Sequence, residues 1–307
     1  MSVIKVEKLT KDYGSGRGVF DVSFEVNEGE VFGFLGPNGA GKSTTIRHLM
    51  GFSKPEKGSC KIFDKESFNK YHEILSKVGY IPGEIALPQG LTGWEFIRMM
   101  QDLQKCHNEE RLNYLLDLFK LDPVGDTKRM SLGVKRKLAI VVANMNDPQV
   151  LILDEPTSGL DPVMQEVFIE FIKNEKKRGK TILLSSHIFS EVDATCDRIA
   201  IIKDGALVSN FIANDLKHAS LKYYTLTFNS NKDYKKFLND KLDYLEVVAS
   251  HDELNRLTIA VDDKCINRFI KEVSKLDLVN FTHEKETLED YFMKYYKEDK
   301  DFEGGLK

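Results

Sequence analysis

The segment GPNGAGKST at residues 36–44 constrains the fold more strongly than any other part of the sequence. It fits the pattern G-x-x-x-x-G-K-S/T, with Gly36, Gly41, Lys42 and Ser43 at the fixed positions. The apolar stretch EVFGFL precedes it and the helical pattern TTIRHLMG follows, which is the strand–loop–helix context that the motif requires. The sequence therefore predicts a loop at the end of a buried strand whose backbone N–H groups surround phosphates.

The residue types in this loop predict a nucleotide and a divalent cation as its ligands. We expect Lys42 to reach the β- and γ-phosphate oxygens of a nucleotide and the Ser43 hydroxyl to bind Mg²⁺. The residues expected to bind the nucleotide in this loop are Gly36, Pro37, Asn38, Gly39, Ala40, Gly41, Lys42, Ser43 and Thr44.

An apolar strand that ends in two acids, QVLILDEP, supplies the other groups that phosphoryl transfer needs. We expect Asp154 to hold Mg²⁺, largely through water, and Glu155 to act as the general base. Two acids at the end of a strand, taken alone, would indicate only an ordinary boundary between a strand and a turn. Their position downstream of a phosphate loop favours the catalytic interpretation.

The stretch MSLGVKRKLAI, residues 130–140, predicts a second helix start with an affinity for anions. Ser131 is a suitable N-cap, because its hydroxyl accepts from free backbone N–H groups. Lys135, Arg136 and Lys137 follow, although cations near a helix N-terminus cost roughly 0.3–1 kcal/mol each in the first turn. Free N–H groups beside cations predict an anion site here.

Length and composition place the chain among ordinary globular proteins, with two domains expected from 307 residues. The net charge of −4 argues against non-specific nucleic-acid binding, and we expect no nucleic-acid partner. The longest apolar runs are too short to cross a bilayer, and the N-terminus has no signal-peptide pattern. Work at a membrane would therefore require a partner.

The order of strand and helix patterns predicts an α/β fold followed by a smaller unit. Residues 2–35 alternate with a period of two, which indicates antiparallel strands leading into a buried strand. Strands alternating with helices then predict a parallel sheet, and residues 92–146 look almost wholly helical. The buried strands of this sheet are expected at 77–81, 149–154, 180–186 and 198–205.

We expect one domain over residues 1–218, with a helical subdomain at about 85–148, and a second over 219–307. The second domain shows the order β-α-β-β-α-β, which resembles the ferredoxin-like split unit, and then a closing helix.

The ordered series of motifs over roughly residues 3–215 resembles the ATP-binding subunits of ABC transporters. SGLD after the two acids is similar to the D-loop of that family, and SSHIFSEVD places His187 at the position of the switch histidine. Tyr13 matches the region whose aromatic side chain stacks on adenine. The resemblance implies a P-loop NTPase of ABC type, with an antiparallel β subdomain and a helical subdomain.

Met130 to Val134 align with the LSGGQ signature of this family, of which Ser131 and Gly133 are present. In the family this signature closes over ATP held by a second subunit. The resemblance therefore implies that Ser131 and Gly133 contact a partner's γ-phosphate, in a homodimer or a heterodimer of ATP-binding subunits.

The family usually has a glutamine in the loop after the strand that ends in VGYIP, and this chain has Gly83 followed by Glu84. Either Glu84 approaches the metal or the loop works through its backbone. The reduced signature, YIPGE and the ending TLEDYFMKYY are similar to the single-domain ATPases of drug, bacteriocin or antibiotic exporters, including bacitracin-type systems.

The function expected from this resemblance is ATP hydrolysis that drives an ABC exporter through separate transmembrane permease subunits. The protein would be cytoplasmic and peripheral on the inner face of the membrane. Trp94, Phe96 and Met99 would then be either an apolar docking surface or, slightly favoured, simple helix core.

Two alternatives remain at this point. A soluble ABC ATPase acting on ribosomes or DNA would usually carry tandem cores or long coiled coils, and the chain has one phosphate loop and no sustained heptads. An ATP-gated clamp that barely hydrolyses is disfavoured by Glu155, although the missing glutamine leaves it open.

Overall fold

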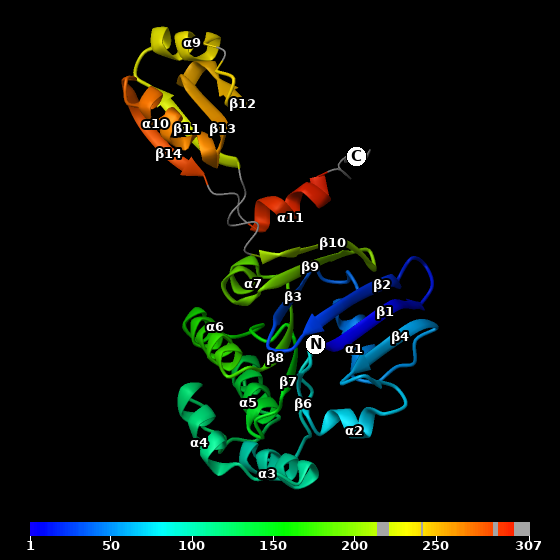
Figure 1. Cartoon of the computed structure of the whole chain (residues 1–307). Helices are drawn as coiled ribbons and strands as arrows, with labels where there is room; N and C mark the ends of the chain where they lie inside the picture. Colours follow the sequence, from blue (N-terminus) through cyan, green and yellow to red (C-terminus); the bar gives the residue numbers. More distant parts are fainter. Residues whose placement is uncertain (214–220, 241, 285–287, 298–307) are drawn as a thin grey trace, which may run out of the picture. The chain divides into compact units, whose positions relative to one another are not determined.

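The chain forms two compact units, Met1–Ala213 and Asn214–Lys307, which are described separately (Figure 1). The domain boundary expected at 218/219 lies outside the described residues. The computed structural model describes residues 1–213, 221–240, 242–284 and 288–297.

The first unit begins with a twisted antiparallel sheet in the order β2-β1-β4-β5. Its long strands β1 and β2 pair antiparallel, as the alternation of residues 2–35 predicts. β4 was not predicted, because KGSCKI buries only Cys60 and Ile62 and reads as a polar stretch. The bounds are β1 Ser2–Asp12, β2 Gly18–Asn27, β4 Lys57–Ile62 and β5 Lys65–Glu66.

The second sheet of this unit has the order β10-β9-β3-β8-β7-β6 and is parallel except at its β9–β10 edge. The four later strands expected from the sequence are all present, and the antiparallel edge strand β10 was not predicted. The bounds are β3 Val31–Leu35, β6 Val78–Ile81, β7 Val150–Asp154, β8 Thr181–Ser186, β9 Arg198–Lys203 and β10 Ala206–Ile212.

Helix α1, Lys42–Leu49, contacts β2 and β4 of the first sheet and β7 of the second. Its Ile46 and Leu49 are fully buried in a core that joins residues of β1 and β2 to Phe32 and Ile152. Burying a large aliphatic side chain contributes about 1.5–3 kcal/mol, so this helix is firmly held. The loop that precedes α1 therefore has a rigid support on both sides.

Three of the remaining helices of the first unit, α3, α4 and α5, lie within residues 85–148, where a helical subdomain is predicted. The expectation that residues 92–146 are almost wholly helical is wrong for 119–131, a loop that contains Pro123 and Gly125. Phe96 is buried helix core, and Trp94 and Met99 are half-buried. The bounds are α2 Tyr71–Leu75, α3 Gly93–Gln104, α4 Glu109–Leu118, α5 Leu132–Asn144, α6 Pro162–Lys177 and α7 Phe189–Thr195.

The second unit contains a four-stranded sheet in the order β12-β13-β11-β14, with every neighbouring pair antiparallel. Tyr234 and Phe237 of α9 and Phe269 of α10 are buried against Leu226 and Ile259 of the sheet. The bounds are β11 Leu221–Phe228, α9 Asn231–Asn239, β12 Leu245–His251, β13 Arg256–Asp262, α10 Ile266–Val273, β14 Leu278–Glu284 and α11 Leu288–Lys297.

Candidate active site

The loop between β3 and α1 combines a buried base with an exposed rim. Gly36, Ala40 and Gly41 are buried, whereas residues 37–39 are exposed. Gly41 caps α1 with a φ of 109°, and a Cβ added there would lie 2.8 Å from the Val19 side chain. A side chain at this position is thus excluded both by the backbone conformation and by space. The rim at residues 37–39 is open to solvent, and a ligand can reach it there.

Lys42 is the first residue of α1 and its side chain is only 5% exposed. The ammonium Nζ donates hydrogen bonds to the Gly36 carbonyl at 2.5 Å and to the Pro37 carbonyl at 3.1 Å. It also lies 3.0 Å from Glu155 Oε1. Lys42 is therefore directed back across the loop, and Ser43 and Thr44 follow it, half-buried, in the first turn of α1.

Asp154 is the last residue of β7 and is 2% exposed. Its Oδ1 accepts a hydrogen bond of 2.5 Å from the Ser185 hydroxyl of the neighbouring strand β8. Glu155 follows with a φ of 49°, in the left-handed region that non-glycine residues rarely adopt. Its backbone N–H donates to the Ser185 carbonyl at 3.0 Å, so β8 fixes this turn.

Glu155 uses its two carboxylate oxygens to connect two other predicted site residues. While Oε1 contacts Lys42, Oε2 lies 2.6 Å from Nδ1 of His187, which follows β8 and is 47% exposed. β3, β8 and β7 are consecutive in the sheet, so their carboxyl ends meet at one edge. The structure thus brings together Lys42, Glu155 and His187 from three separate stretches of sequence.

Glu191 on α7 is a buried acid near this site that sequence reasoning missed. It is 2% exposed, and its Oε2 accepts a hydrogen bond of 2.6 Å from the Ser186 hydroxyl. Burial raises the pKa of this carboxyl to about 7, against the lowering effect of hydrogen bonds from Ser186 and Thr157, and the charge of Glu155 raises it further. Its position four residues after His187, one helical turn on, was the only sequence signal.

The predicted N-cap at Ser131 is confirmed, since its Oγ accepts a hydrogen bond of 3.3 Å from Val134 N–H. Ser131 is exposed at the start of α5, and a Cβ added to Gly133 would lie 2.9 Å from the Gly159 carbonyl. Gly133 therefore lies beside the loop after β7. The expected contact of Ser131 and Gly133 with a partner's phosphate stays a prediction.

The three cations that follow Ser131 do not act together at this helix start. Arg136 turns inward, is 2% exposed and donates hydrogen bonds to the carbonyls of Pro82, Gly83 and Ser158. Lys135 and Lys137 are half-buried. The sequence interpretation of Arg136 as part of an anion site missed this contact set.

The loop after β6 approaches Asp154 through its backbone. A Cβ added to Gly83 would lie 2.9 Å from Asp154 Oδ2, closer than real Cβ atoms come to other groups. Glu84, the alternative metal ligand considered from the sequence, is exposed. The backbone at Gly83 therefore comes close to Asp154, while the role of Glu84 toward the metal stays a prediction.

Tyr13 follows β1 and is 57% exposed, with its N–H donating to the Arg17 carbonyl at 2.8 Å. Lys11 Nζ lies 5.5 Å from the centroid of its ring. The ring is accessible for stacking, and its role toward adenine stays a prediction.

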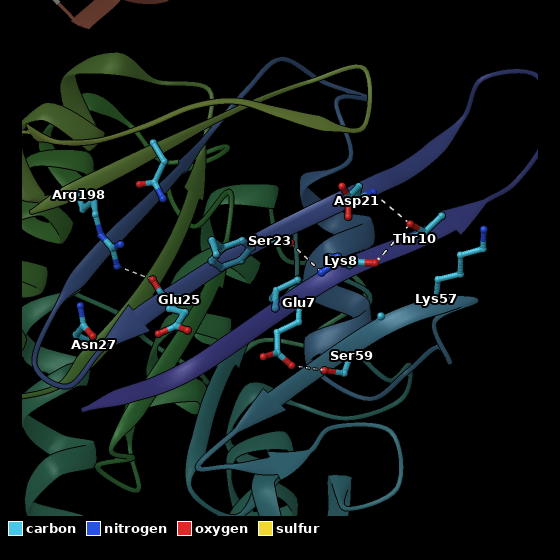
Figure 2. Close-up of a pocket in the computed structure, with 14 residues that line it drawn as sticks. Glu7, Lys8, Thr10, Asp21, Ser23, Glu25, Asn27, Lys57, Ser59 and Arg198 are labelled. Atoms are coloured by element: carbon cyan, nitrogen blue, oxygen red, sulfur yellow. Dashed lines mark hydrogen bonds between the residues drawn. The ribbon is translucent and has the colours of Figure 1, made fainter.

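A broad pocket elsewhere in the first unit has no part in this arrangement. Figure 2 shows it on β1, β2 and β4, with Arg198 of β9 at its margin, and none of the predicted site residues lines it. Its polar groups bond to one another, as in the hydrogen bonds from Ser59 Oγ to Glu7 at 2.9 Å and from Lys8 N–H to Ser23 Oγ at 2.8 Å. These four groups therefore already have hydrogen-bond partners within the protein.

Within the described ranges, the structure contains no helix that is both long enough and apolar enough to cross a membrane.

Comparison with known proteins assigns the chain to a family. A family model described as "ABC transporter" matches residues 19–158. The bacitracin transport ATP-binding protein BcrA of Bacillus licheniformis is 32% identical, over 95% of this chain and 97% of the relative, and BcrA of Enterococcus faecalis is 29% identical, over 95% and 96%. A solved structure of an ATP-binding subunit of an ABC transporter is 31% identical with a TM-score of 0.65, over 71% of this chain and 92% of that one. These matches confirm the resemblance found in the motifs: the chain belongs to the family of ABC transporter ATP-binding proteins.

Proposed function

We propose that this protein is the ATP-binding and ATP-hydrolysing subunit of an ABC exporter. As a family member the chain is an ATPase. The observation that carries the catalytic part is the contact of Glu155 with both Lys42 and His187, which joins the phosphate loop to the acid after β7. The export part is supported by the likeness to the bacitracin transport proteins, which extends over 95% of this chain.

The donor set at the carboxyl edge of the sheet fits ATP and Mg²⁺. The exposed rim of the phosphate loop offers backbone N–H groups to the phosphates, and Tyr13 offers a ring to the adenine. The Ser43 hydroxyl and the Asp154 carboxylate are hard oxygen donors that would hold Mg²⁺, an ion that takes its other ligands from water and phosphate. When bound, the ion neutralises charge that develops on the phosphate oxygens.

Glu155 then acts on the attacking water. Its carboxylate accepts a proton from the water, while His187 fixes one carboxylate oxygen through its Nδ1 contact. Lys42 leaves the loop carbonyls and the carboxylate for the phosphate oxygens, which are better partners for an ammonium.

A second ATP-binding subunit completes each site in this proposal. Ser131 and the N–H groups at the start of α5 are exposed and offer donors to the γ-phosphate of ATP on the partner. ATP then favours the closed dimer through its higher affinity for that state, and hydrolysis releases it.

The translocation path comes from separate permease subunits, to which this chain binds peripherally at the cytoplasmic face, with no nucleic acid involved. We also propose that residues 219–307 form a ferredoxin-like accessory domain after the ATPase domain at 1–218, because the sheet order β12-β13-β11-β14 is what a split βαββαβ unit produces.

The test uses the Glu155→Gln protein, tagged and loaded with Mg·ATP, to capture partners from detergent-solubilised membranes of its source cells. Recovery of a protein with several long hydrophobic spans supports the exporter function. Recovery of ribosomes or DNA instead would favour the soluble-ATPase alternative. An ATPase assay of the unmodified protein with Mg²⁺ is run in parallel, and no hydrolysis above a Lys42→Ala control would favour the clamp that barely hydrolyses.

A further inference from the structure

Arg136 is a buried cation in the first turns of α5 whose charge is satisfied by backbone carbonyls alone. Its guanidinium donates to the Ser158 carbonyl at 3.0 Å through Nε, to the Pro82 carbonyl at 2.9 Å through Nη1 and to the Gly83 carbonyl at 2.8 Å through Nη2. In the part of the chain that the structure describes, no carboxylate lies within ion-pair distance of it. Buried cations are normally paired with acids, so an arrangement with three carbonyls is a costly one.

These three hydrogen bonds join segments that are far apart in the sequence. Pro82 and Gly83 form the loop between β6 and the helical subdomain, Ser158 lies in the loop after β7, and Arg136 itself belongs to the helix that Ser131 caps. The Arg136 side chain thus connects α5, which we call the signature helix, to two loops near the acids at the end of β7.

Each of the two loops also has a close contact of its own near the site. Gly83 lies so close to Asp154 that an added Cβ would be 2.9 Å from Oδ2. An added Cβ on Gly159, the neighbour of Ser158, would lie 2.8 Å from the side chain of Leu132. A shift of the Pro82–Gly83 loop would therefore move the backbone next to Asp154. A shift of the loop that contains Ser158 would change the packing at the start of α5.

The planar guanidinium group of an arginine can donate to all three carbonyls at once. The ammonium group of a lysine cannot hold its donors in this arrangement. Two N–H groups on one edge meet consecutive carbonyls of one loop while Nε serves another loop, which requires donors held in a fixed plane. Burial lowers the pKa of Arg136, and the negative charges of Asp154 and Glu155 oppose this lowering only in part.

We propose that Arg136 is a positioning residue for ATP hydrolysis, which holds the Pro82–Gly83 loop against Asp154 and couples it to the signature helix. The inference rests on the proposed ATPase function. The arrangement also explains how a chain with glycine at the usual glutamine position keeps this loop at the metal-binding acid: the backbone at Gly83 makes the contact and Arg136 maintains it.

The test compares Arg136→Lys and Arg136→Gln with Lys137→Gln, a matched control that removes a cation from the next position on the same helix. We expect both Arg136 variants to lose about tenfold or more in kcat, because neither side chain can make all three hydrogen bonds that hold the two loops. The affinity for ATP, measured by equilibrium binding in each variant, should stay within about twofold of the unmodified protein, because the phosphate loop is untouched. Lys137→Gln should keep the original kcat.

A double-mutant cycle with Gly83→Ala measures whether the two substitutions affect kcat independently. If Arg136 only stabilised the fold, the two effects on kcat would be independent. If both residues act through the position of one loop at Asp154, their effects on kcat should be clearly non-additive. If Arg136→Gln does not fold, Arg136→Lys and Gly83→Ala complete the cycle. Arg136→Lys with the kcat of the unmodified protein, or effects that add independently, would overturn the inference and leave the proposed function standing. Absence of hydrolysis in the unmodified protein would instead overturn the proposed function.

Discussion

Glu155 lies between Lys42 and His187, with one carboxylate oxygen 3.0 Å from Nζ and the other 2.6 Å from Nδ1. The contact connects the start of α1 to the ends of β7 and β8, three elements that the chain reaches at widely separated points. The same residue is expected to receive the proton of the attacking water, so its contacts determine the geometry of the base.

Replacement of Glu155 by Gln should lower ATP turnover by roughly 10²–10⁴-fold, the usual scale for a positioned base. ATP binding should be preserved, because the change removes a negative charge beside Lys42 and the phosphates. Turnover and equilibrium ATP binding are measured on the same preparation, with Glu166→Gln on the exposed side of α6 as the control. Hydrolysis at the original rate would exclude Glu155 as the base.

Replacement of Ser131 by Arg should abolish ATP-dependent dimerisation while the monomer keeps its affinity for ATP. A large side chain at this exposed N-cap blocks access to the helix N–H groups but lies outside the chain's own phosphate loop. Light scattering of protein carrying Glu155→Gln, with and without Mg·ATP, measures the dimer. Ser131→Ala is the control for the cap itself, whose loss costs about 1 kcal/mol. A dimer that survives Ser131→Arg rules out this surface as the partner contact.

Glu191 should make stability fall as pH rises from about 5 to about 8. The folded pKa, about 7, lies above the ordinary value of 4.5, so the folded state binds more protons than the unfolded state between these values. The stabilisation is fully present below the unfolded pKa, is lost as pH rises through the folded pKa, and amounts to at most about 3 kcal/mol. Glu191→Gln should therefore gain stability relative to the unmodified protein at pH 8 and gain little at pH 5. Urea unfolding across this range checks the slope, and a difference independent of pH would contradict it.

The buried acid Glu175 should matter far more to stability than an exposed acid on the same helix. Its carboxylate lies 2.7 Å from Arg111 Nη2 of α4 and 2.8 Å from Arg178 Nη1, and its side chain is 2% exposed. Glu175→Gln leaves a buried cation uncompensated, so we expect a loss of about 3–5 kcal/mol in the free energy of unfolding. Glu170→Gln breaks the exposed pair with Lys173, which solvent screens, and should lower the free energy of unfolding far less than Glu175→Gln. Equal losses in the two variants would show that the α4–α6 contact contributes little.

The parts of the fold that sequence predicted well are those with strong local patterns. The buried strands β3, β6, β7 and β8 are short apolar runs, and alternation marks β1 and β2. β10 was not predicted from the sequence, because none of its residues is fully buried and the strand is defined by its pairing with β9. The loop at 119–131 was predicted as helix, because its apolar residues resemble a helix pattern, which Pro123 and Gly125 interrupt.

The site divides in the same way between local and long-range information. The phosphate loop, the acids after β7 and the cap at Ser131 are short motifs that can be read directly. The inward turn of Arg136 depends on carbonyls from distant loops, and the raised pKa of Glu191 depends on burial under several elements. Neither feature leaves a pattern in neighbouring residues, so only the folded chain reveals it.

The left-handed backbone at Glu155 has a consequence for laboratory evolution of this protein. A side chain in that conformation costs about 1–2 kcal/mol that glycine would avoid. Glycine or asparagine at this position would thus relieve strain while deleting the carboxylate. A screen that rewards only expression or heat resistance would enrich inactive chains at residue 155, so any stabilisation of this ATPase needs a counter-selection for turnover.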